Sequence, residues 1–564
     1  MSAVNMARAN KLKRSQKPTP STIRLRRSPG SDQAEEPLQP VDELEKSCVG
    51  EFFLMHSTLI EIGKRALADC VALHEQCKPT TSTSSTYFRP TRLIDLESLE
   101  RPKLIDSKAI IGEDQRYACL SHQWGKPDQD TKQAMTTTCD NLQARVDGID
   151  FWALPERYRE SILICKSLGI RYMWIDSLCI IQDCHEDWRT ESGMMAQIYE
   201  NGILTISSNL PVDGQAWKPP LPAKTPYPVI RDNGEEWFTT MLLHGPLASR
   251  AWCLQERYLS PRILHIFEKN LWIWECSTRV RGAHKNGLLY RRDVTEHQDR
   301  PWRKQLMDTR LDRSTLLDLW YNAVSDYSNR SLTYDTDKLP AISGIAAKLQ
   351  TILNYKYLAG LWQEDIIHGL LWHNGSNPMR LDVWPWVYDS AFKEEMESLP
   401  VLKVPSSYIA PSWSWASFQG PVEFMRLGGS NFTPLATLKS SSIETLGGTS
   451  ERLGQVGQRS HIVLCGHFCD PIPRLQAAHP SIALVMLDGR IAFTLEELHY
   501  FVIGIIDRKM FNTQERCKWL GLILHSSDPG ANIYSRVGIF SFSVYMADDM
   551  SHLYAGTMAE ITIV

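Results

Sequence analysis

The sequence predicts an α/β protein: a doubly wound, mainly parallel sheet, then a helical region, then a β-rich C-terminal domain. Short apolar runs alternate with helical segments between residues 117 and 276, a spacing typical of parallel sheets. Apolar residues recur three or four positions apart through 311–375, as they do in helices. Beyond residue 411 the apolar runs are short, and they predict strands at 461–468, 500–506, 520–524 and 537–544.

The expected core begins with three strands, at 117–122, 172–176 and 202–207. Pro155 stands where a helix favours proline, in its first turn, and Gly169 stands where a helix favours glycine, just past its end. The expected helices are 154–169, 187–199 and 250–259, and two further strands follow at 263–267 and 271–276.

Composition divides the chain into five segments. The first is rich in Lys, Arg, Pro and Ser and has little apolar periodicity, so we expect it to be disordered. The second has helical spacing followed by a Thr/Ser-rich stretch. The segments are a basic tail (1–47), a helical lead-in and linker (48–114), the α/β core (115–280), a helical extension (281–400) and the β-rich domain (401–564).

Charge and apolar runs exclude several classes of function. Residues 1–31 carry eight basic residues and no acidic one, which leaves 53 basic and 65 acidic residues in the remainder. Nucleic-acid binding needs clustered cations, so we expect no nucleic-acid partner for the folded part. No apolar run reaches the length of about 18 residues that crosses a bilayer, so we expect no membrane span.

Cysteine use and the N-terminal residues predict a cytoplasmic or nuclear protein. The thirteen Cys are scattered, odd in number and not preceded by a signal peptide, which favours free, mostly buried thiols in a reducing compartment. Basic clusters at 11–14 and 24–27 fit a bipartite nuclear address, a solvated tail or an organellar presequence.

Three blocks of sequence resemble the fungal heterokaryon-incompatibility (HET) family. They are Tyr117-Ala-Cys-Leu-Ser-His-Gln-Trp-Gly125, Trp174-Ile-Asp-Ser-Leu-Cys-Ile-Ile-Gln-Asp183 and Arg250-Ala-Trp-Cys-Leu-Gln-Glu-Arg257. Later blocks, among them Pro411-Ser-Trp-Ser-Trp-Ala416, are similar to longer members, so the resemblance covers roughly residues 115–420. It implies a fungal protein with a role in non-self recognition and programmed cell death.

The HET family in turn resembles Toll/interleukin-receptor (TIR) domains, some of which cleave NAD. The Trp-Cys-x-x-Glu arrangement that carries the TIR catalytic glutamate matches Trp252 to Glu256, so the resemblance implies Glu256 as the catalytic residue. About forty residues separate the third strand from this helix, where TIR domains have a short turn. Catalysis of this kind needs no metal and no second acid, so NAD is expected as a substrate and no cofactor is expected.

Polar residues follow each of the first three expected strands, and ligands in such sheets bind beyond the carboxyl ends of the strands. Glu256 on the following helix faces the same crevice in this interpretation. The expected NAD-binding residues are Ser121, His122, Trp124, Gly125, Asp176, Ser207 and Trp252.

Each of these residues also has a purely structural interpretation. Glu256 can be a helix carboxylate paired with Arg257 or Lys269, or a partner for Arg250. Asp176 can cap the turn after its strand, and Trp124, Trp174 and Trp252 can be core residues. Gly125 fits a tight turn with either function.

Other chemistries find little support. Ser121 and His122 are adjacent, so on a strand they point to opposite faces and form no nucleophile–base pair. The sequence contains neither a complete P-loop nor a Gly-x-Ser-x-Gly elbow. His461, Cys465, His467 and Cys469 share one strand face, but residues two apart on a strand are almost 7 Å apart, so we expect no metal site.

Two functions from different classes remain. In one, the chain is an incompatibility effector that works by self-association, responds to an unidentified incompatibility partner protein and cleaves NAD through Glu256. In the other, it is a non-enzymatic, self-associating signalling or scaffold module with the same fold. A regulatory protein that kept the fold for another role is a third interpretation.

Overall fold

The computed structural model describes residues 41–78, 88–110, 115–210, 241–284, 286–293, 311–375, 407–425, 427, 431–446, 453–469, 483–488, 497–508, 516–528, 530–545 and 558–564. Met1–Phe52 and Phe53–Val564 form two units. The two basic clusters lie outside the described residues. Helix α1 (Val41–Leu73) begins inside the segment 1–47 that was expected to be disordered.

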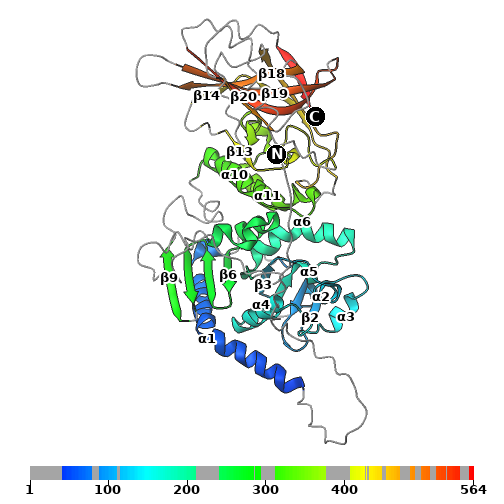
Figure 1. Cartoon of the computed structure of the whole chain (residues 1–564), viewed down its shortest axis with the longest axis vertical. Helices are drawn as coiled ribbons and strands as arrows, with labels where there is room; N and C mark the ends of the chain where they lie inside the picture. Colours follow the sequence, from blue (N-terminus) through cyan, green and yellow to red (C-terminus); the bar gives the residue numbers. More distant parts are fainter. Residues whose placement is uncertain are drawn as a thin grey trace, which may run out of the picture. The chain divides into compact units, whose positions relative to one another are not determined.

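The described strands of the α/β core form one mixed sheet of nine strands, in the order β2-β1-β4-β3-β5-β6-β7-β8-β9 (Figure 1). Neighbours among β4, β3, β5 and β6 are parallel, and the remaining neighbours are antiparallel. The strands are β1 (Arg92–Asp95), β2 (Lys103–Asp106), β3 (Tyr117–Ser121), β4 (Tyr172–Ile175), β5 (Leu204–Ser208), β6 (Arg262–Glu268), β7 (Leu271–Cys276), β8 (Arg279–His284) and β9 (Gly287–Asp293).

The α/β class is confirmed, but the expectation of a mainly parallel sheet is wrong. Strands β6 to β9 follow one another with two residues between each pair, and connections this short join only antiparallel neighbours. Strands β1 and β2, from the expected lead-in, add an antiparallel edge beside β4. The sheet also continues to Asp293, past the expected boundary at residue 280.

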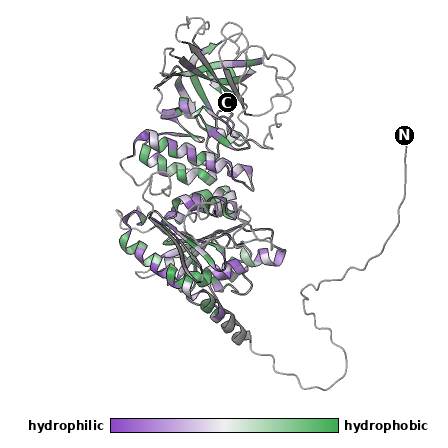
Figure 2. Cartoon of the chain, turned by 60° about the vertical axis from the view of Figure 1, so that its left-hand side comes forward, coloured by the Kyte–Doolittle hydropathy of each residue, from purple (hydrophilic) through white to green (hydrophobic). Residues whose placement is uncertain are grey.

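Hydrophilic and hydrophobic residues are mixed along the helices of the chain, as the colours in Figure 2 show. Helix α4 buries Tyr158, Ile162 and Cys165 and ends before Gly169, whose φ of 74° suits glycine. The helices are α2 (Gln129–Met135), α3 (Leu142–Asp147), α4 (Glu156–Ser167), α5 (Asp176–Cys179), α6 (His185–Asn201) and α8 (Ala251–Leu259).

Residues 311–375 and 407–425 form a helical region with an aromatic core, in which Trp320, Trp362, Trp372, Trp413 and Trp415 are fully buried. It contains α10 (Arg313–Ser328), α11 (Pro340–Leu353), α12 (Ile366–Gly369), β10 (Tyr357–Leu358), β11 (Leu361–Trp362), β12 (Trp372–Asn374) and β13 (Val422–Phe424). The short 3₁₀ helices of the chain are η1 (Glu75–Cys77), η2 (Ser107–Ala109), η3 (Pro246–Ser249), η4 (Asp335–Asp337), η5 (Gln363–Asp365) and η6 (Trp415–Ser417).

The C-terminal region is rich in β-structure, as predicted. Its described strands form an eight-stranded sheet in the order β14-β18-β19-β20-β21-β16-β15, with β17 paired to β20. They are β14 (Asn431–Pro434), β15 (Thr437–Ser442), β16 (His461–Cys469), β17 (Ala483–Leu487), β18 (Leu498–Arg508), β19 (Arg516–Asp528), β20 (Ile533–Tyr545) and β21 (Ala559–Ile563). Among the described residues, no helix combines the length and the apolar character needed to cross a membrane.

Candidate functional site

Polar side chains meet where three parallel strands of the sheet end. Ser121, the last residue of β3, pairs in register with Ser207 of β5. Leu120 pairs with Ile175, the last residue of β4, and Asp176 follows it directly as the first residue of α5. The carboxyl ends of parallel strands share one edge of a sheet, so Ser121, Asp176 and Ser207 lie along the same edge.

The Asp176 carboxylate is held by two donors. Trp124 Nε1 donates to Oδ2 at 3.0 Å, and the backbone nitrogen of Ser177 donates to Oδ1 at 2.7 Å. Burial raises the pKa of Asp176, although Trp124, Ser177 and Arg250 stabilise its ionised form. The side chain keeps 27% of its surface exposed, so solvent reaches Asp176.

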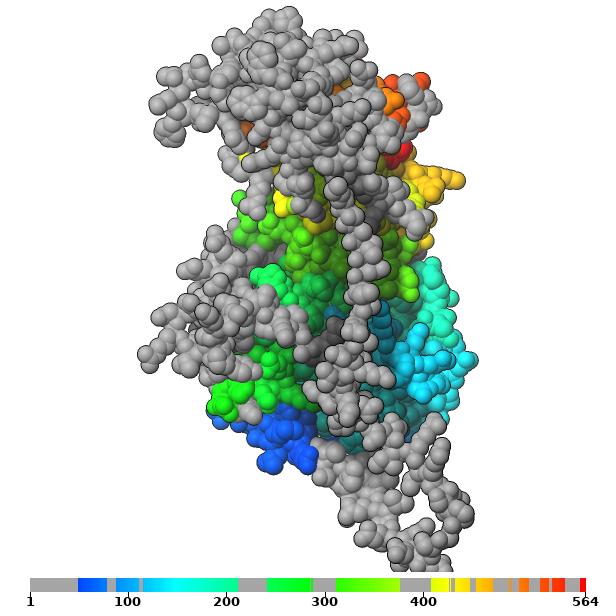
Figure 3. All heavy atoms as spheres, in the orientation of Figure 1, coloured from blue at the N-terminus to red at the C-terminus, as the bar shows by residue number. Residues whose placement is uncertain are grey.

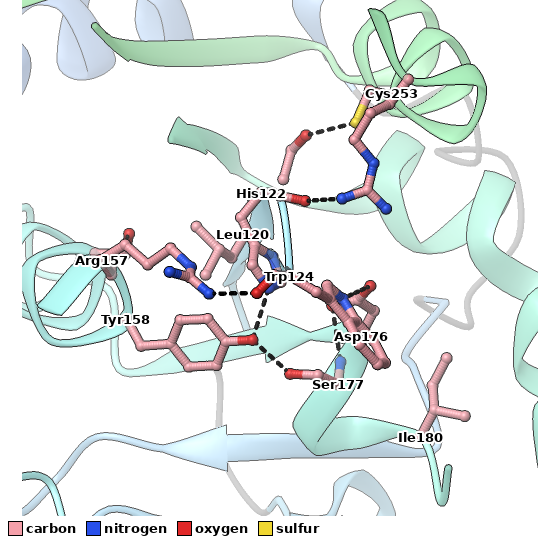
Figure 4. Close-up of polar contacts among 12 residues, drawn as sticks. Leu120, His122, Trp124, Arg157, Tyr158, Asp176, Ser177, Ile180 and Cys253 are labelled. Carbon is pink, nitrogen blue, oxygen red and sulfur yellow. Dashed lines mark hydrogen bonds and ion pairs between the residues drawn. The ribbon is translucent and has the colours of Figure 1, made fainter. Parts of the chain in front are cut away.

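A series of buried hydrogen bonds lies beside Asp176 (Figure 4). His122 Nε2 lies 2.6 Å from the Tyr158 hydroxyl, which lies 2.7 Å from Ser177 Oγ. His122 Nδ1 is 3.8 Å from Asp176 Oδ1. Burial first, and then the cations of Arg157 and Arg250, hold the pKa of His122 well below its ordinary value. His122 is therefore neutral near pH 7 and serves this chain through hydrogen bonds.

Ser121 and His122 lie on opposite sides of the strand, as their adjacency predicts. His122 points to Tyr158 of α4, whereas the Ser121 hydroxyl lies 3.8 Å from Cys253 Sγ of α8. The guanidinium of Arg250, just before α8, donates to the His122 carbonyl oxygen at 3.2 Å. This bond ties the start of α8 to the end of β3.

Glu256 lies on the buried side of α8, near Ser121 and Asp176. Only 6% of the residue is exposed, and its Oε2 is buried without a hydrogen-bond partner among the described residues. Burial raises the pKa of Glu256 to about 7; the Ser121 hydroxyl opposes this rise, the charge of Asp176 adds to it, and Arg250 opposes it. A carboxyl group that is half ionised near neutral pH is a candidate for acid–base or charge-stabilising chemistry.

Residues 117–256 match the family model described as Heterokaryon incompatibility protein (HET). The chain contains a HET domain. This domain indicates a role in heterokaryon incompatibility. Neither the curated proteins nor the solved structures contain a match to this chain.

The matched segment begins at the first residue of β3 and ends at Glu256. It therefore includes the ends of the three parallel strands and the hydrogen bonds that link His122, Tyr158 and Ser177. It also includes Glu256, the acidic residue near these strand ends. Strands β6 to β9 follow the matched segment, and they continue the sheet beside β5.

A second polar chain crosses the boundary of the HET domain. Ser207 Oγ lies 3.2 Å from His265 Nδ1 of β6, and His265 Nε2 lies 2.8 Å from Glu275 Oε2 of β7. Arg257 of α8 donates to both oxygens of Glu275, at 3.0 and 3.1 Å. Because an ionised carboxylate only accepts, the neutral His265 donates from Nε2 and accepts from Ser207 at Nδ1.

A cavity of about 30 Å³ lies between strands β3, β5 and β6 and helix α8. It has space for one or two water molecules. Its lining includes Ser121, Ser207, Cys253, Arg257 and His265. Neither Asp176 nor Glu256 is among its lining residues.

Two predicted site residues lie elsewhere or serve the backbone. Trp252 Nε1 donates to Asp337 Oδ2 of η4 at 3.2 Å, and the indole packs against the core of the helical region. The structure thus does not bring Trp252 to the strand ends. Gly125 follows Trp124 with a φ of 72°, a conformation that glycine adopts without steric cost, so it forms the turn after β3.

The site includes residues that the sequence interpretation missed. Tyr158 was counted only as an apolar position of its helix, although its hydroxyl joins two polar side chains. Cys253 was considered only as part of the Trp-Cys-x-x-Glu arrangement. Arg250 was considered only as a partner of Glu256, and Arg157, Ser177, His265 and Glu275 were not considered. One available signal was position: Ser177 follows Asp176, the end of the expected strand 172–176, and Arg250 is the first residue of the expected helix 250–259.

Proposed function

We propose that this protein is an effector of heterokaryon incompatibility, active in the cytoplasm or nucleus, that contributes to non-self recognition and programmed cell death. The HET match over residues 117–256 supports the incompatibility role. We further propose that the HET domain cleaves NAD and that Glu256 is its catalytic carboxylate.

The observation that carries this proposal is the state of Glu256. Its carboxyl group is buried and has a pKa of about 7, and one of its oxygens has no partner within the part of the chain that the structure describes. An unpartnered buried carboxyl destabilises the fold, and such groups are concentrated where function needs them. Ser121, Asp176 and Arg250 give it neighbours that can donate to a substrate or accept from one.

The proposed reaction breaks the bond between ribose C1′ of NAD and the nicotinamide nitrogen. Both electrons of the bond leave with nicotinamide, and the ribose acquires oxocarbenium character. A water oxygen then bonds to C1′ and loses a proton, which gives ADP-ribose. The ionised form of Glu256 stabilises the positive charge that develops on the ribose.

The remaining roles follow from exposure and position. Asp176 is partly exposed and accepts from Trp124, so it is placed to hold ribose hydroxyls beside an aromatic ring. Ser121, His122, Gly125 and Ser207 form the rest of the proposed binding edge. This assignment treats the strands β4-β3-β5-β6 as the doubly wound core that the TIR resemblance implies, with strands on both sides of β3.

The burial of Glu256 determines when the reaction can occur. Only 6% of the residue is exposed, so NAD reaches the carboxylate only if α8 shifts relative to the strand ends. We propose that self-association, or contact with an incompatibility partner, causes this shift. Single chains should then be inactive and assembled chains active.

The same burial of Glu256 favours the alternative function, a non-enzymatic self-associating module. In that function the polar groups at the strand ends only build the fold, and assembly itself transmits the signal. The two functions differ in one respect that can be measured, the release of nicotinamide.

The deciding experiment compares wild-type protein with Glu256→Gln, both as single chains and as assembled preparations, for nicotinamide release from NAD. Glu191→Gln is the matched control, because Glu191 is another buried glutamate of the HET domain whose Oε2 has no partner among the described residues. Its Oε1 lies 3.9 Å from Arg92 Nη2, away from the proposed site. We expect release by the assembled wild type and Glu191→Gln, and none by Glu256→Gln.

Two outcomes would favour the alternative. The first is no nicotinamide above background from assembled wild-type protein. The second is expression toxicity in a fungal host that persists undiminished in Glu256→Gln, because a signal carried by assembly alone does not need the carboxylate.

A further inference from the structure

Four potential metal ligands from distant parts of the chain meet at one buried point. Cys70, His74 and Cys77 come from the end of α1 and from η1, and Cys276 is the last residue of β7. Their ligand atoms all lie within 4.8 Å of one another, and all four residues are buried. None of them belongs to the proposed NAD site, so the inference below is independent of the proposed function.

The end of α1 brings three of these ligands together. The backbone nitrogen of His74 donates to the Cys70 carbonyl at 3.1 Å, and the backbone nitrogen of Cys77 donates to the His74 carbonyl at 3.0 Å. These two tight turns place the side chains of a Cys-x₃-His-x₂-Cys sequence on one side. Spacings of this length are usual for ligands of structural zinc sites.

The separations fit a tetrahedral zinc ion. With Zn–S of ~2.3 Å and Zn–N of ~2.0 Å, tetrahedral geometry puts sulfur and nitrogen about 3.5 Å apart. Cys276 Sγ and His74 Nδ1 lie 3.6 Å apart. Sulfur ligands around the same ion should be about 3.8 Å apart, so the cluster needs only a slight contraction from its outer limit of 4.8 Å.

Charge around the cluster supports a bound cation with thiolate ligands. Arg262, the first residue of β6, is buried, and its Nε donates to Cys70 Sγ at 3.2 Å. No carboxylate of the described residues forms an ion pair with Arg262. Three thiolates and Zn²⁺ carry a net charge of −1, which the guanidinium neutralises. With neutral thiols instead, the buried cation of Arg262 would have no counter-charge, which is costly.

We propose that Cys70, His74, Cys77 and Cys276 bind one structural zinc ion. Four protein ligands leave no open coordination position, which is the arrangement of structural rather than catalytic zinc. The ion joins the end of α1 to β7, outside the segment that matches the HET family. This proposal replaces the expectations that these thiols are free and that the chain holds no metal.

Nearby contacts indicate what the zinc site stabilises. Asp69 pairs with Arg281 of β8 at 3.2 Å, and the His56 ring stacks on Trp272 of β7. In Figure 3 the blue atoms of α1 adjoin the green atoms of these strands. The zinc ion therefore joins α1 to the antiparallel strands β7 and β8 of the nine-stranded sheet.

The test measures metal content in full-length protein purified under reducing conditions without chelators. We expect about one zinc per chain in the wild type, and roughly tenfold less in Cys77→Ser. Cys165→Ser is the matched control, because Cys165 is equally buried and donates to the Ile170 carbonyl, which a serine hydroxyl can replace. This control should keep its zinc.

A second measurement uses only wild-type protein, so it does not depend on whether Cys77→Ser folds. After zinc is replaced by Co²⁺, we expect the visible bands of tetrahedral cobalt and a thiolate-to-cobalt charge-transfer band. The proposal is overturned if wild-type protein contains no zinc and gives no such bands. It is also overturned if wild type and Cys77→Ser contain equal zinc, or if mass spectrometry of the freshly purified chain finds a disulfide among Cys70, Cys77 and Cys276.

Discussion

Glu256 on α8 and Glu275 on β7 are both buried glutamates, and their surroundings shift their pKa in opposite directions. For Glu275, burial alone would raise the pKa, but Arg257 and His265 outweigh it and hold the pKa well below its ordinary value. For Glu256, burial dominates and raises the pKa to about 7. Glu275 accepts three hydrogen bonds, whereas Oε2 of Glu256 has no partner among the described residues.

The comparison shows that burial by itself does not define the role of an acidic residue. A fully partnered carboxylate such as Glu275 holds elements together, here α8 and β6 to β7. A partly partnered carboxyl group such as that of Glu256 reduces stability. Its raised pKa and its oxygen without a described partner make Glu256 a functional candidate. Glu256 also lies within the HET match, and Glu275 lies beyond it.

The largest effect is expected for Glu275→Ala. This change leaves the partly buried cation of Arg257 without its carboxylate, and breaking a buried pair costs up to about 3–5 kcal/mol. Urea denaturation measures the loss. Glu156→Gln is the control, since it removes an exposed ion pair with Lys269 and should have no measurable effect. A loss for Glu275→Ala as small as that of the control would remove the contrast between the two glutamates.

Glu256→Gln should change how stability depends on pH. The pKa of Glu256 rises from 4.5 to about 7 on folding, so its favourable contribution is complete below pH 4.5 and is lost as the pH rises through 7. The glutamine variant lacks this loss. Its stability relative to wild type should therefore increase by up to about 3 kcal/mol between the two ends of that range. Parallel pH curves for the two proteins would contradict a raised pKa.

Tyr158→Phe should have an intermediate effect. It removes the hydroxyl that lies 2.6 Å from His122 and 2.7 Å from Ser177, and leaves two buried polar groups each short of one partner. The expected cost is about 1–3 kcal/mol in urea denaturation. Tyr258→Phe is the control, because its hydroxyl bonds to the more exposed Asp326 and should matter less. Equal losses in both would show that the buried chain has no special weight.

The smallest effect is expected for Ser121→Ala. The Ser121 hydroxyl stabilises the ionised form of Glu256, so its removal should raise the pKa of Glu256 further. The pH at which stability falls should then move upward. Ser167→Ala is the control, since the Ser167 hydroxyl bonds only to the Leu163 carbonyl among the described residues. A downward shift in Ser121→Ala would contradict the proposed contact.

The sequence allowed the parallel strands and their helices to be predicted because their patterns are local. Tyr172–Ile175 is apolar throughout and is buried throughout, and the Pro and Gly signals bounded α4. The antiparallel extension was harder to predict. Strand β8 reads Arg-Val-Arg-Gly-Ala-His, which has little apolar alternation, and its place in the sheet depends on pairing with β7 and β9.

The site was predicted only in part for a related reason. Strand ends identify Ser121, Asp176 and Ser207, because the geometry of a parallel sheet brings them together. Helix α8 contacts both the sheet and α11. Gln255 of α8 accepts a hydrogen bond from the backbone nitrogen of Gly344 in α11. Periodicity alone therefore could not tell that Trp252 faces Asp337 instead of the strand ends. Partners such as His265 and Glu275 depend on strand pairing that no local pattern encodes.

The most direct test of the central claim is the pH dependence of nicotinamide release by assembled wild-type protein. If ionised Glu256 stabilises the developing charge on the ribose, release should rise with pH and reach half of its maximum near pH 7. The rise should disappear in Glu256→Gln and remain in Glu191→Gln. A rate that does not change between about pH 6 and pH 8, or one that Glu256→Gln leaves intact, would contradict the account.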